Sequence, residues 1–316
     1  MSVTAHAPGK LFITGEWAVL RGAPALVAAV DRHAVVTVDA GDRGVVVESL
    51  AEGRTTRLDV DAPLPLGDAG TVLAVARTLG IRTPLHVVVD SRSFLVGDRK
   101  LGLGRSAATL VAATAALQPA AAARAILDAA LAANALFQAG QGSGADIAAA
   151  VYGGVVEARR AEPALAVERR TLPVGLHLLA GWTGTSAHTT PLLTRFATVT
   201  APASFAELFA VAVRAAEAVA RGDAATLLDA VDRSAALLAR FGTELDLPIV
   251  TPALSTLVRA ANRVGAAAKP SGAGAGDCGI ALATSTTQAA AVRAAWEEVG
   301  IVPLDVVIAD EGVTVG

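Results

Sequence analysis

Cysteine, basic tracts and targeting signals are nearly or wholly missing from this chain. Cys278 is the only cysteine among 316 residues, so the chain cannot form an internal disulfide, which fits a reducing, cytoplasmic setting. The net charge is −3 and no basic run is interleaved with aromatic residues, so we expect no nucleic-acid partner. No charged stretch followed by an apolar run opens the sequence, and no secretory signal is predicted.

Apolar runs long enough to span a membrane are also lacking. The most apolar stretch, 107–123, is interrupted by Thr109, Thr114, Gln118 and Pro119. It therefore predicts a buried helix that ends near Pro119, and no membrane partner. Hydrophobic residues make up 53% of the chain and charged residues 17%, which predicts a folded protein with a large core.

Lysine is scarce in this chain, and the few lysines present follow a pattern. Lys10, Lys100 and Lys269 are the only lysines among 26 basic residues, and each stands beside a glycine-rich segment. The compact ammonium of lysine serves a phosphate oxygen differently from the planar guanidinium of arginine. The pattern favours anion binding at these segments, with a plain compositional bias against lysine as the alternative.

The order of apolar segments predicts an α+β protein of two layered domains, not a regular βαβ array. The expected strands are 10–14, 27–38, 45–47, 85–89, 176–181, 279–283 and 304–308. The expected helices are 106–117, 121–137, 205–219, 224–240 and 252–264, with a short helix running into a strand over 147–156. Residues 159–170 are charged and irregular, so we expect the boundary there, between domains 1–170 and 171–316.

The best candidate for a phosphate loop is the segment Gly102, Leu103, Gly104, Arg105, Ser106 and Ala107, which a long apolar helix follows at once. Glycines let the backbone approach an anion, and the free N–H groups of the helix end point at it. Ser106 is either a plain helix cap or a phosphate or metal ligand. A Walker A loop is excluded because no Gly-Lys-Ser/Thr tripeptide occurs. A dinucleotide-binding fold is excluded because a second helix, not a strand, follows the first.

Three further glycine-rich segments carry polar side chains. One surrounds Asp146, which helix capping would also explain. Another places Lys10 and Glu16 at opposite ends of an expected strand, where a surface lysine and turn glycines are the alternative. The third runs from Lys269 to Cys278 and leads into a strand, and a tight turn would equally explain it.

Taken together and in this order, the segments resemble the GHMP kinases over nearly the whole chain. Residues 8–16, Pro-Gly-Lys-Leu-Phe-Ile-Thr-Gly-Glu, resemble the first motif of that superfamily. Residues 102–108 resemble its second motif, the ATP phosphate loop, and residues 269–279 its third. The resemblance implies a ribosomal protein S5-like N-terminal domain and a ferredoxin-like C-terminal domain, with the active site between them.

Within the superfamily the chain looks most like the phosphomevalonate kinases. Trp17 stands where mevalonate kinases usually carry histidine, and segments 142–154 and 181–190 also resemble the phosphomevalonate branch. The chain departs from the pattern where Arg105 replaces a serine of the phosphate loop. Arg105 either binds a further phosphate oxygen or hinders nucleotide access. No glutamate upstream of Asp146 matches the magnesium ligand of mevalonate kinases.

The resemblance implies transfer of the γ-phosphoryl of ATP, with Mg²⁺, to 5-phosphomevalonate, a step of isoprenoid precursor synthesis, by a monomer or homodimer. It implies Lys10 and Asp146 as catalytic residues, Lys100 with residues Gly102 to Ala107 as ATP ligands, and Ser106 as the metal ligand. The implied substrate ligands are Glu16, Ser143, Ser186, Thr189, Thr190, Lys269, Ser271, Gly272, Ala273 and Gly274. The alternatives are mevalonate kinase, a diphosphomevalonate decarboxylase relative, or a nucleotide-binding homologue that Arg105 has impaired.

For a phosphate acceptor, positive charge at the site should matter more than a catalytic base. A phosphomonoester has its second pKa near 6, so its attacking oxygen is largely deprotonated at neutral pH and needs little help from a base. Bringing that dianion to ATP is the harder task. We therefore expect Lys10, Lys100 and Arg105 to supply a positive field and Asp146 to matter less than Lys10.

Overall fold

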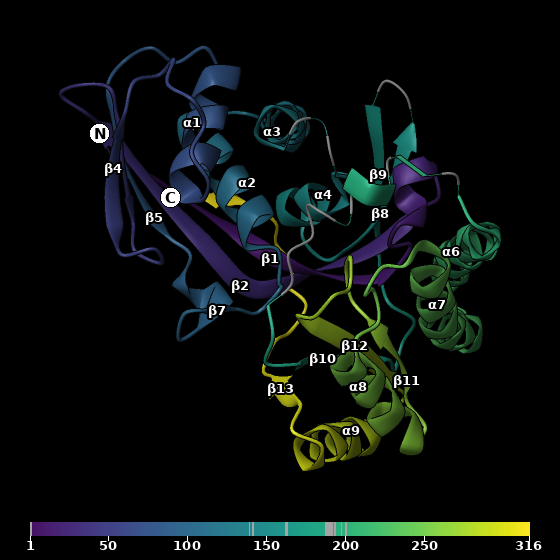
Figure 1. The fold of residues 1–316 in the computed structure, drawn as a ribbon. Coiled ribbons are helices and arrows are strands. Elements are labelled where there is room, and N and C mark those ends of the chain that lie inside the picture. The colour runs from purple at the N-terminus through teal and green to yellow at the C-terminus, as the bar shows by residue number, and fades with distance from the viewer. Residues whose placement is uncertain are drawn as a thin grey trace.

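The computed structural model describes residues 2–138, 140, 142–161, 164–186, 192, 194–196, 198–199 and 201–316. In this part of the chain a mixed sheet is built on two long antiparallel strands, β1 and β2 (Figure 1). Its strands are β1 (Val3–Thr14), β2 (Ala25–Ala40), β3 (Val45–Ser49), β4 (Arg54–Leu58), β5 (Leu85–Asp90), β8 (Val155–Ala161), β9 (Ala164–Arg170) and β14 (Thr314–Val315). The main path of the sheet has the order β14-β1-β2-β5-β3-β4, and the β8–β9 hairpin pairs with the other part of β2.

Both faces of the two long strands are buried because apolar residues occupy successive positions. Leu11 and Ile13 of β1 belong to one apolar cluster, whereas Phe12 belongs to the cluster on the opposite face. Side chains of a strand alternate between faces, so a continuous apolar run predicts a strand covered on both sides. The strand that carries Lys10 is therefore fixed between two layers.

Four helices cover one face of this sheet, as Figure 1 shows above β1 and β2. They are α1 (Asp68–Thr78), α2 (Arg105–Leu117), α3 (Ala123–Phe137) and α4 (Ala145–Tyr152). Helix α2 packs against β1 and β2 through alanine and other small side chains, which allow close approach of helix and sheet. Short 3-10 helices at Ala18–Arg21 and Arg92–Phe94 and the hairpin β6 (Leu95–Val96) and β7 (Arg99–Lys100) complete this half.

A second, four-stranded antiparallel sheet lies on the face of β1 and β2 opposite to these four helices. Its order is β11 (Ala267–Pro270), β12 (Cys278–Ala283), β10 (His177–Trp182) and β13 (Val302–Leu304). Helices α8 (Pro252–Arg263) and α9 (Thr286–Glu298) cover one of its faces. Helices α6 (Ala203–Arg221) and α7 (Ala224–Leu245) lie beside both sheets.

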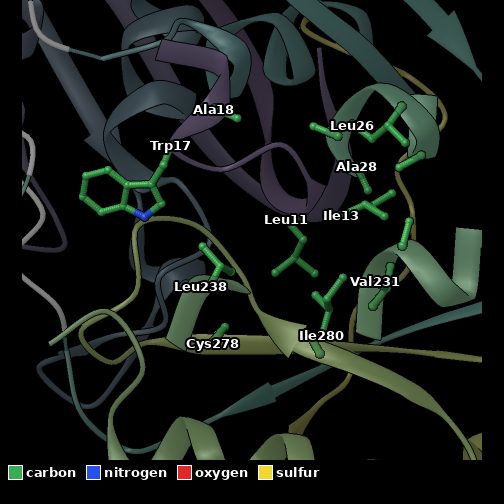
Figure 2. Packing of buried hydrophobic residues seen from close by; sticks show 14 of the residues in the cluster. Leu11, Ile13, Trp17, Ala18, Leu26, Ala28, Val231, Leu238, Cys278 and Ile280 are labelled. Atoms are coloured by element: carbon green, nitrogen blue, oxygen red, sulfur yellow. The ribbon is translucent and has the colours of Figure 1, made fainter. Parts of the chain in front are cut away.

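One apolar cluster joins the two sheets. Figure 2 shows Leu11 and Ile13 of β1 beside Leu238 of α7 and Ile280 of β12, all of them buried. Burying a leucine or isoleucine side chain contributes about 1.5–3 kcal/mol, so this shared core holds the two halves together. The third glycine-rich segment, between β11 and β12, is thereby placed against β1.

The predicted α+β class is confirmed, whereas part of the element prediction is wrong. Residues 159–161 and 164–170 are not irregular: they belong to β8 and β9, which form an antiparallel hairpin through seven residue pairs. Helices α1 and α9 and the short strands β4, β6, β7, β9, β11 and β14 were not predicted. The last predicted strand, 304–308, ends in the structure at Leu304.

The domain division at residue 170 stays a prediction. The first sheet takes strands from residues 3–170 and the second from residues 177–304, but β14 returns to pair with β1. None of the helices in the described ranges combines the length and the apolar run that a bilayer crossing requires.

Candidate active site

The predicted phosphate loop leads directly into α2 without a side-chain cap. Gly104 is the N-cap residue, and its φ of 83° lies in the left-handed region that favours glycine. Ser106 is exposed in the first turn, where the N–H groups have no helical acceptors. With no capping side chain to satisfy them, these N–H groups are available to an anion.

Lys10 reaches this loop from β1. Its backbone N–H donates to the carbonyl of Leu103 at 2.7 Å, and its Nζ donates to the carbonyl of Gly102 at 3.3 Å. A Cβ on Gly104 would lie 2.7 Å from Cγ of Lys10, so only glycine lets the lysine lie along the loop. Among the residues that the structure describes, no carboxylate forms an ion pair with Lys10.

The third glycine-rich segment closes on the same place. A Cβ on Gly272 would lie 3.6 Å from Nζ of Lys10, so this turn passes beside the ammonium. Asp277 packs against Gly102, and the thiol of Cys278 donates to the carbonyl of Leu101 at 2.7 Å. Burial raises the pKa of the Cys278 thiol, which makes it a structural donor and not a nucleophile. The segments at residues 8–16, 102–107 and 269–278 are therefore in contact.

Glu16 and Lys269, both predicted substrate ligands, form a buried ion pair with each other. Lys269 is 0% exposed and Glu16 4%, and Nζ of Lys269 also donates to the carbonyl of Pro270 at 2.6 Å. Burial lowers the pKa of Lys269, against the opposite influence of Glu16. The backbone N–H of Gly272 donates to Glu16 at 3.3 Å, so the pair supports the turn beside Lys10. Contact of Glu16 or Lys269 with a substrate stays a prediction.

Ser271 holds the same turn to β1. Its hydroxyl accepts from the backbone N–H of Phe12 at 2.9 Å and donates to the carbonyl of Phe12 at 3.1 Å. Gly274 has a φ of +84° and lies against the carbonyl of Ile249, while Ala273 is partly buried against the shared core. These contacts show how Ser271, Ala273 and Gly274 shape the turn, and their role as substrate ligands stays a prediction.

Lys100 and Ser186 lie side by side at the edge of the site. The hydroxyl of Ser186 accepts from the backbone N–H of Lys100 at 3.1 Å and is 3.3 Å from its carbonyl. The Lys100 side chain is exposed, two residues before Gly102. Thr189 and Thr190, predicted in the same loop as Ser186, lie outside the described residues.

Ser143 and Asp146 stand at the start of α4. Asp146 is the second residue of the helix, not its N-cap, which is Gly144. No ion pair joins Asp146 to Lys10, although the structure describes both side chains. Ser143 lines a hollow of about 280 Å³ together with Asn134 and Arg160. None of the residues lining that hollow belongs to the phosphate loop or to the third glycine-rich segment.

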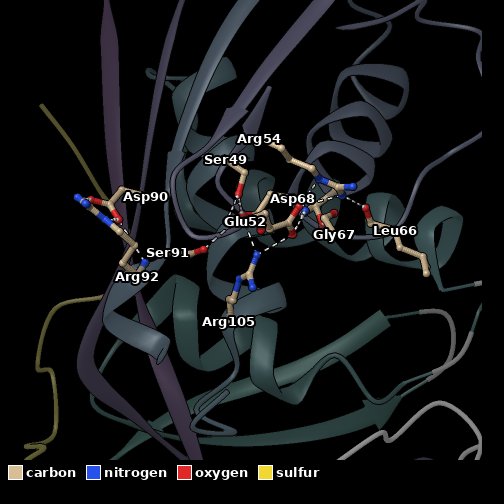
Figure 3. Close-up of polar contacts among 11 residues, drawn as sticks. Ser49, Glu52, Arg54, Leu66, Gly67, Asp68, Asp90, Ser91, Arg92 and Arg105 are labelled. Atoms are coloured by element: carbon tan, nitrogen blue, oxygen red, sulfur yellow. Dashed lines mark hydrogen bonds and ion pairs between the residues drawn. The ribbon is translucent and has the colours of Figure 1, made fainter. Parts of the chain in front are cut away.

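Arg105 points away from the loop, toward two carboxylates that sequence reasoning missed. Its Nη2 atom lies 2.8 Å from Oε1 of Glu52 and 2.9 Å from Oδ2 of Asp68 (Figure 3). Glu52 belongs to the β3–β4 turn and Asp68 to the first turn of α1, so no sequence spacing links either residue to the phosphate loop. The two predicted roles of Arg105, binding a further phosphate oxygen and hindering nucleotide access, are not tested by these ion pairs and stay predictions.

The metal ligand stays a prediction. Among the residues that the structure describes, no group of three or more His, Cys, Asp or Glu side chains is placed to hold a metal ion. Mg²⁺ is often bound by few protein groups, together with substrate phosphates and water. The exposed hydroxyl of Ser106 beside the uncapped helix end fits such a sparse protein contribution.

The Glu52 cluster predicts an acid-sensitive stability. Burial alone would raise the pKa of Glu52, but the Asp68 backbone N–H together with Arg105 and Arg54 lowers it below 4.5. The unfolded chain then binds more protons, so the stabilisation is present above pH 4.5 and is lost as the pH falls through the folded-state pKa. We expect the difference in free energy of unfolding between wild type and Glu52→Gln to shrink on acidification.

Urea unfolding at several pH values from about 7 down to about 3 would measure this difference. Glu297 is exposed and forms no ion pair in the described residues, so Glu297→Gln serves as the matched control. A Glu52→Gln difference that stays constant over the whole pH range would contradict the prediction.

Comparisons with known proteins agree with this arrangement. The family profile described as "GHMP kinases C terminal" matches residues 215–302. The chain is 36% identical over 369 residues to a phosphomevalonate kinase of Streptomyces sp. (strain CL190), covering 99% of this chain and 98% of that protein. It is 32% identical over 299 residues to a mevalonate kinase of Aeropyrum pernix, covering 88% and 87%.

A solved structure shares the fold. The Streptococcus pneumoniae phosphomevalonate kinase in complex with phosphomevalonate and AMPPNP has a TM-score of 0.83 to this chain. The match has 21% identity and covers 96% of this chain and 99% of the other. Since the Streptomyces relative shares 36% identity over essentially the whole length of both proteins, this chain belongs to the GHMP kinase family.

Proposed function

We propose that this kinase transfers the γ-phosphoryl of ATP to the phosphate of 5-phosphomevalonate, giving 5-diphosphomevalonate and ADP. The observation that carries the proposal is the position of Lys10. Its ammonium lies between the loop at Gly102–Gly104 and the turn at Gly272, beside the uncapped start of α2. A cation there faces both the place where ATP phosphates would bind and the third glycine-rich turn.

The physical chemistry of the acceptor supports this site. A phosphate acceptor is largely deprotonated at neutral pH, so the barrier comes from bringing two polyanions into line. A positioned cation and oriented N–H groups lower that barrier by electrostatic stabilisation. Asp146, without an ion pair to Lys10, is assigned the lesser role of shaping the field around the acceptor.

ATP would place its phosphates on the N–H groups of residues 102–107, with Lys100 at the outer edge. Mg²⁺ would be held by the ATP phosphates with the Ser106 hydroxyl as the protein ligand, and it would neutralise charge on the phosphate oxygens. Lys10 would contact the transferred group. Because Arg105 is engaged by Glu52 and Asp68, it leaves the mouth of the loop open and gives no reason to expect an impaired enzyme. A cytoplasmic monomer or homodimer remains the prediction for location and assembly.

An acceptor screen tests the proposal. The protein is incubated with ATP, Mg²⁺ and one acceptor at a time, and ADP release is followed by a coupled assay. We expect turnover with 5-phosphomevalonate that exceeds turnover with mevalonate by at least about 100-fold, because a site that pairs with a phosphate rejects an alcohol lacking it. Mass spectrometry of the product should show one added phosphoryl group.

The controls of the screen separate the neighbouring activities. The 32% identity to a mevalonate kinase makes mevalonate the most informative competing acceptor. Diphosphomevalonate, assayed for release of CO₂, tests the decarboxylase alternative. Faster turnover with mevalonate, or CO₂ release from diphosphomevalonate, would overturn the proposed acceptor while leaving the family intact.

A further inference from the structure

Arg105 stands in the first turn of α2, yet its charge is directed into the N-terminal half. A single guanidinium nitrogen, Nη2, bridges Glu52 at 2.8 Å and Asp68 at 2.9 Å. The Arg105 side chain is 15% exposed and that of Asp68 4%. Ion pairs that are this poorly solvated are screened much less than surface pairs.

The partners of Arg105 are themselves held in place. Asp68 accepts from the hydroxyls of Ser49 at 2.6 Å and Ser91 at 3.3 Å, as Figure 3 shows. Glu52 accepts from the backbone N–H of Asp68 at 3.1 Å, which ties the β3–β4 turn to the start of α1.

The charges within the cluster balance. Arg54 pairs with Glu52 at 2.9 Å from the solvent side. Two arginines therefore face two carboxylates, and the cluster as a whole is neutral.

We propose that Arg105 is a positioning residue for the nucleotide. It ties the first turn of α2 to α1 and the β3–β4 turn, and together with Arg54 it balances the two carboxylate charges beside the phosphate loop. This inference rests on the proposed binding of ATP at that loop. Arg105 thus aids ATP binding without contacting a phosphate.

The alternative, a direct phosphate contact, carries a clear cost. To reach ATP, Arg105 would have to leave both carboxylates, and Asp68 would remain buried without a cation. Breaking a buried pair leaves an uncompensated charge, which is strongly unfavourable. The same reasoning explains why a serine at this position would not substitute for arginine: Glu52 and Asp68 would then face each other and the triphosphate.

The test measures binding of AMPPNP in the presence of Mg²⁺ by calorimetric titration, without any acceptor. We expect Arg105→Ser to raise the Kd for AMPPNP about tenfold, or about 1.4 kcal/mol. Adding Glu52→Gln to Arg105→Ser should recover at least a third of that loss on the free-energy scale, because it removes the one negative charge that Arg54 alone does not balance. Raising the salt concentration should narrow the gap between Arg105→Ser and wild type.

Single variants distinguish positioning from phosphate contact. Glu52→Gln in the otherwise unchanged protein should leave the Kd unchanged or weaken binding, whereas release of a phosphate-binding Arg105 would tighten it. Arg105→Lys should recover part of the affinity by keeping one ion pair. Arg221 pairs with Glu217 at the exposed end of α6, outside this cluster, so Arg221→Ser is the control and should bind as wild type does.

Steady-state kinetics give the second readout. In Arg105→Ser the KM for ATP should rise while kcat changes less than threefold, since the transferred phosphoryl does not contact Arg105. An Arg105→Ser Kd within twofold of wild type, tighter binding by Glu52→Gln, or no recovery in the double variant would each overturn the inference. If Arg105→Ser does not fold, Glu52→Gln and Arg105→Lys decide the question. Because no acceptor is present in the titration, its result is independent of whether phosphomevalonate is the substrate.

Discussion

Replacing Lys10 by methionine is expected to lower kcat on phosphomevalonate by about 100- to 1000-fold, the usual loss when one preorganised electrostatic group is removed. Methionine keeps most of the length and apolar contact of the lysine chain, which lies along Gly104, and removes the charge and the hydrogen bond to the carbonyl of Gly102. The ammonium beside Gly102 and Gly272 is the group that we expect to neutralise the two approaching polyanions.

The ranking of variants makes the Lys10 prediction specific. Asp146→Asn should lower kcat far less than Lys10→Met, because a phosphate acceptor needs little help from a base. Arg263→Met, which removes one exposed positive charge at the end of α8, is the matched control for loss of a cation outside the site. A larger loss for Asp146→Asn than for Lys10→Met would refute the electrostatic assignment.

Lys269→Met is expected to lower the free energy of unfolding by about 3–5 kcal/mol, the cost of leaving a buried charge without its partner. Lys269 is fully buried and paired with Glu16, which would be left beside the apolar core. Urea unfolding followed by intrinsic tryptophan fluorescence would measure the change. Loss of stability, and not a selective change in KM, is the expected signature.

A double variant isolates the pair. Glu16→Gln combined with Lys269→Met removes both charges and should be more stable than Lys269→Met alone, since no unpaired carboxylate remains. Lys100→Met is the control and should change stability by less than about 0.5 kcal/mol, as expected of an exposed position. Equal stability of the Lys269→Met single variant and wild type would show that the pair contributes nothing to folding.

The three lysines show where sequence reasoning succeeds and where it stops. Their positions beside glycine-rich segments indicated anion binding, which stays a prediction, and the structure brings those segments together. Their environments differ in ways that no local pattern encodes. Lys10 has no ion pair among the described residues, Lys100 is exposed, and Lys269 is paired with Glu16, which lies 253 residues away.

Arg105 and helix α1 illustrate the same limit. The partners of Arg105 are 53 and 37 residues earlier in the sequence, so its ion pairs depend on tertiary packing alone. Helix α1 was missed because it contains Gly70, which lowers helix propensity. The structure explains that glycine: a Cβ there would collide with the carbonyl of Pro65.

The prediction of an irregular boundary at residues 159–170 was wrong for a different reason. Only one side chain of strand β9 is buried, so polar residues fill most of its positions and hide the alternation. An edge hairpin of this kind needs charge to avoid pairing with other chains. Charge density alone therefore does not distinguish a linker from an exposed hairpin.

Strand β14 has a consequence for how the enzyme comes together during synthesis. The strand that carries Lys10 is made before its neighbour, residues 314–315, and the whole of the second sheet is made between them. The nucleotide half therefore cannot be complete until the second sheet has been synthesised. Two chain crossings, at residues 171–176 and 305–313, then join the two sheets, so any hinge between them must bend both crossings at once.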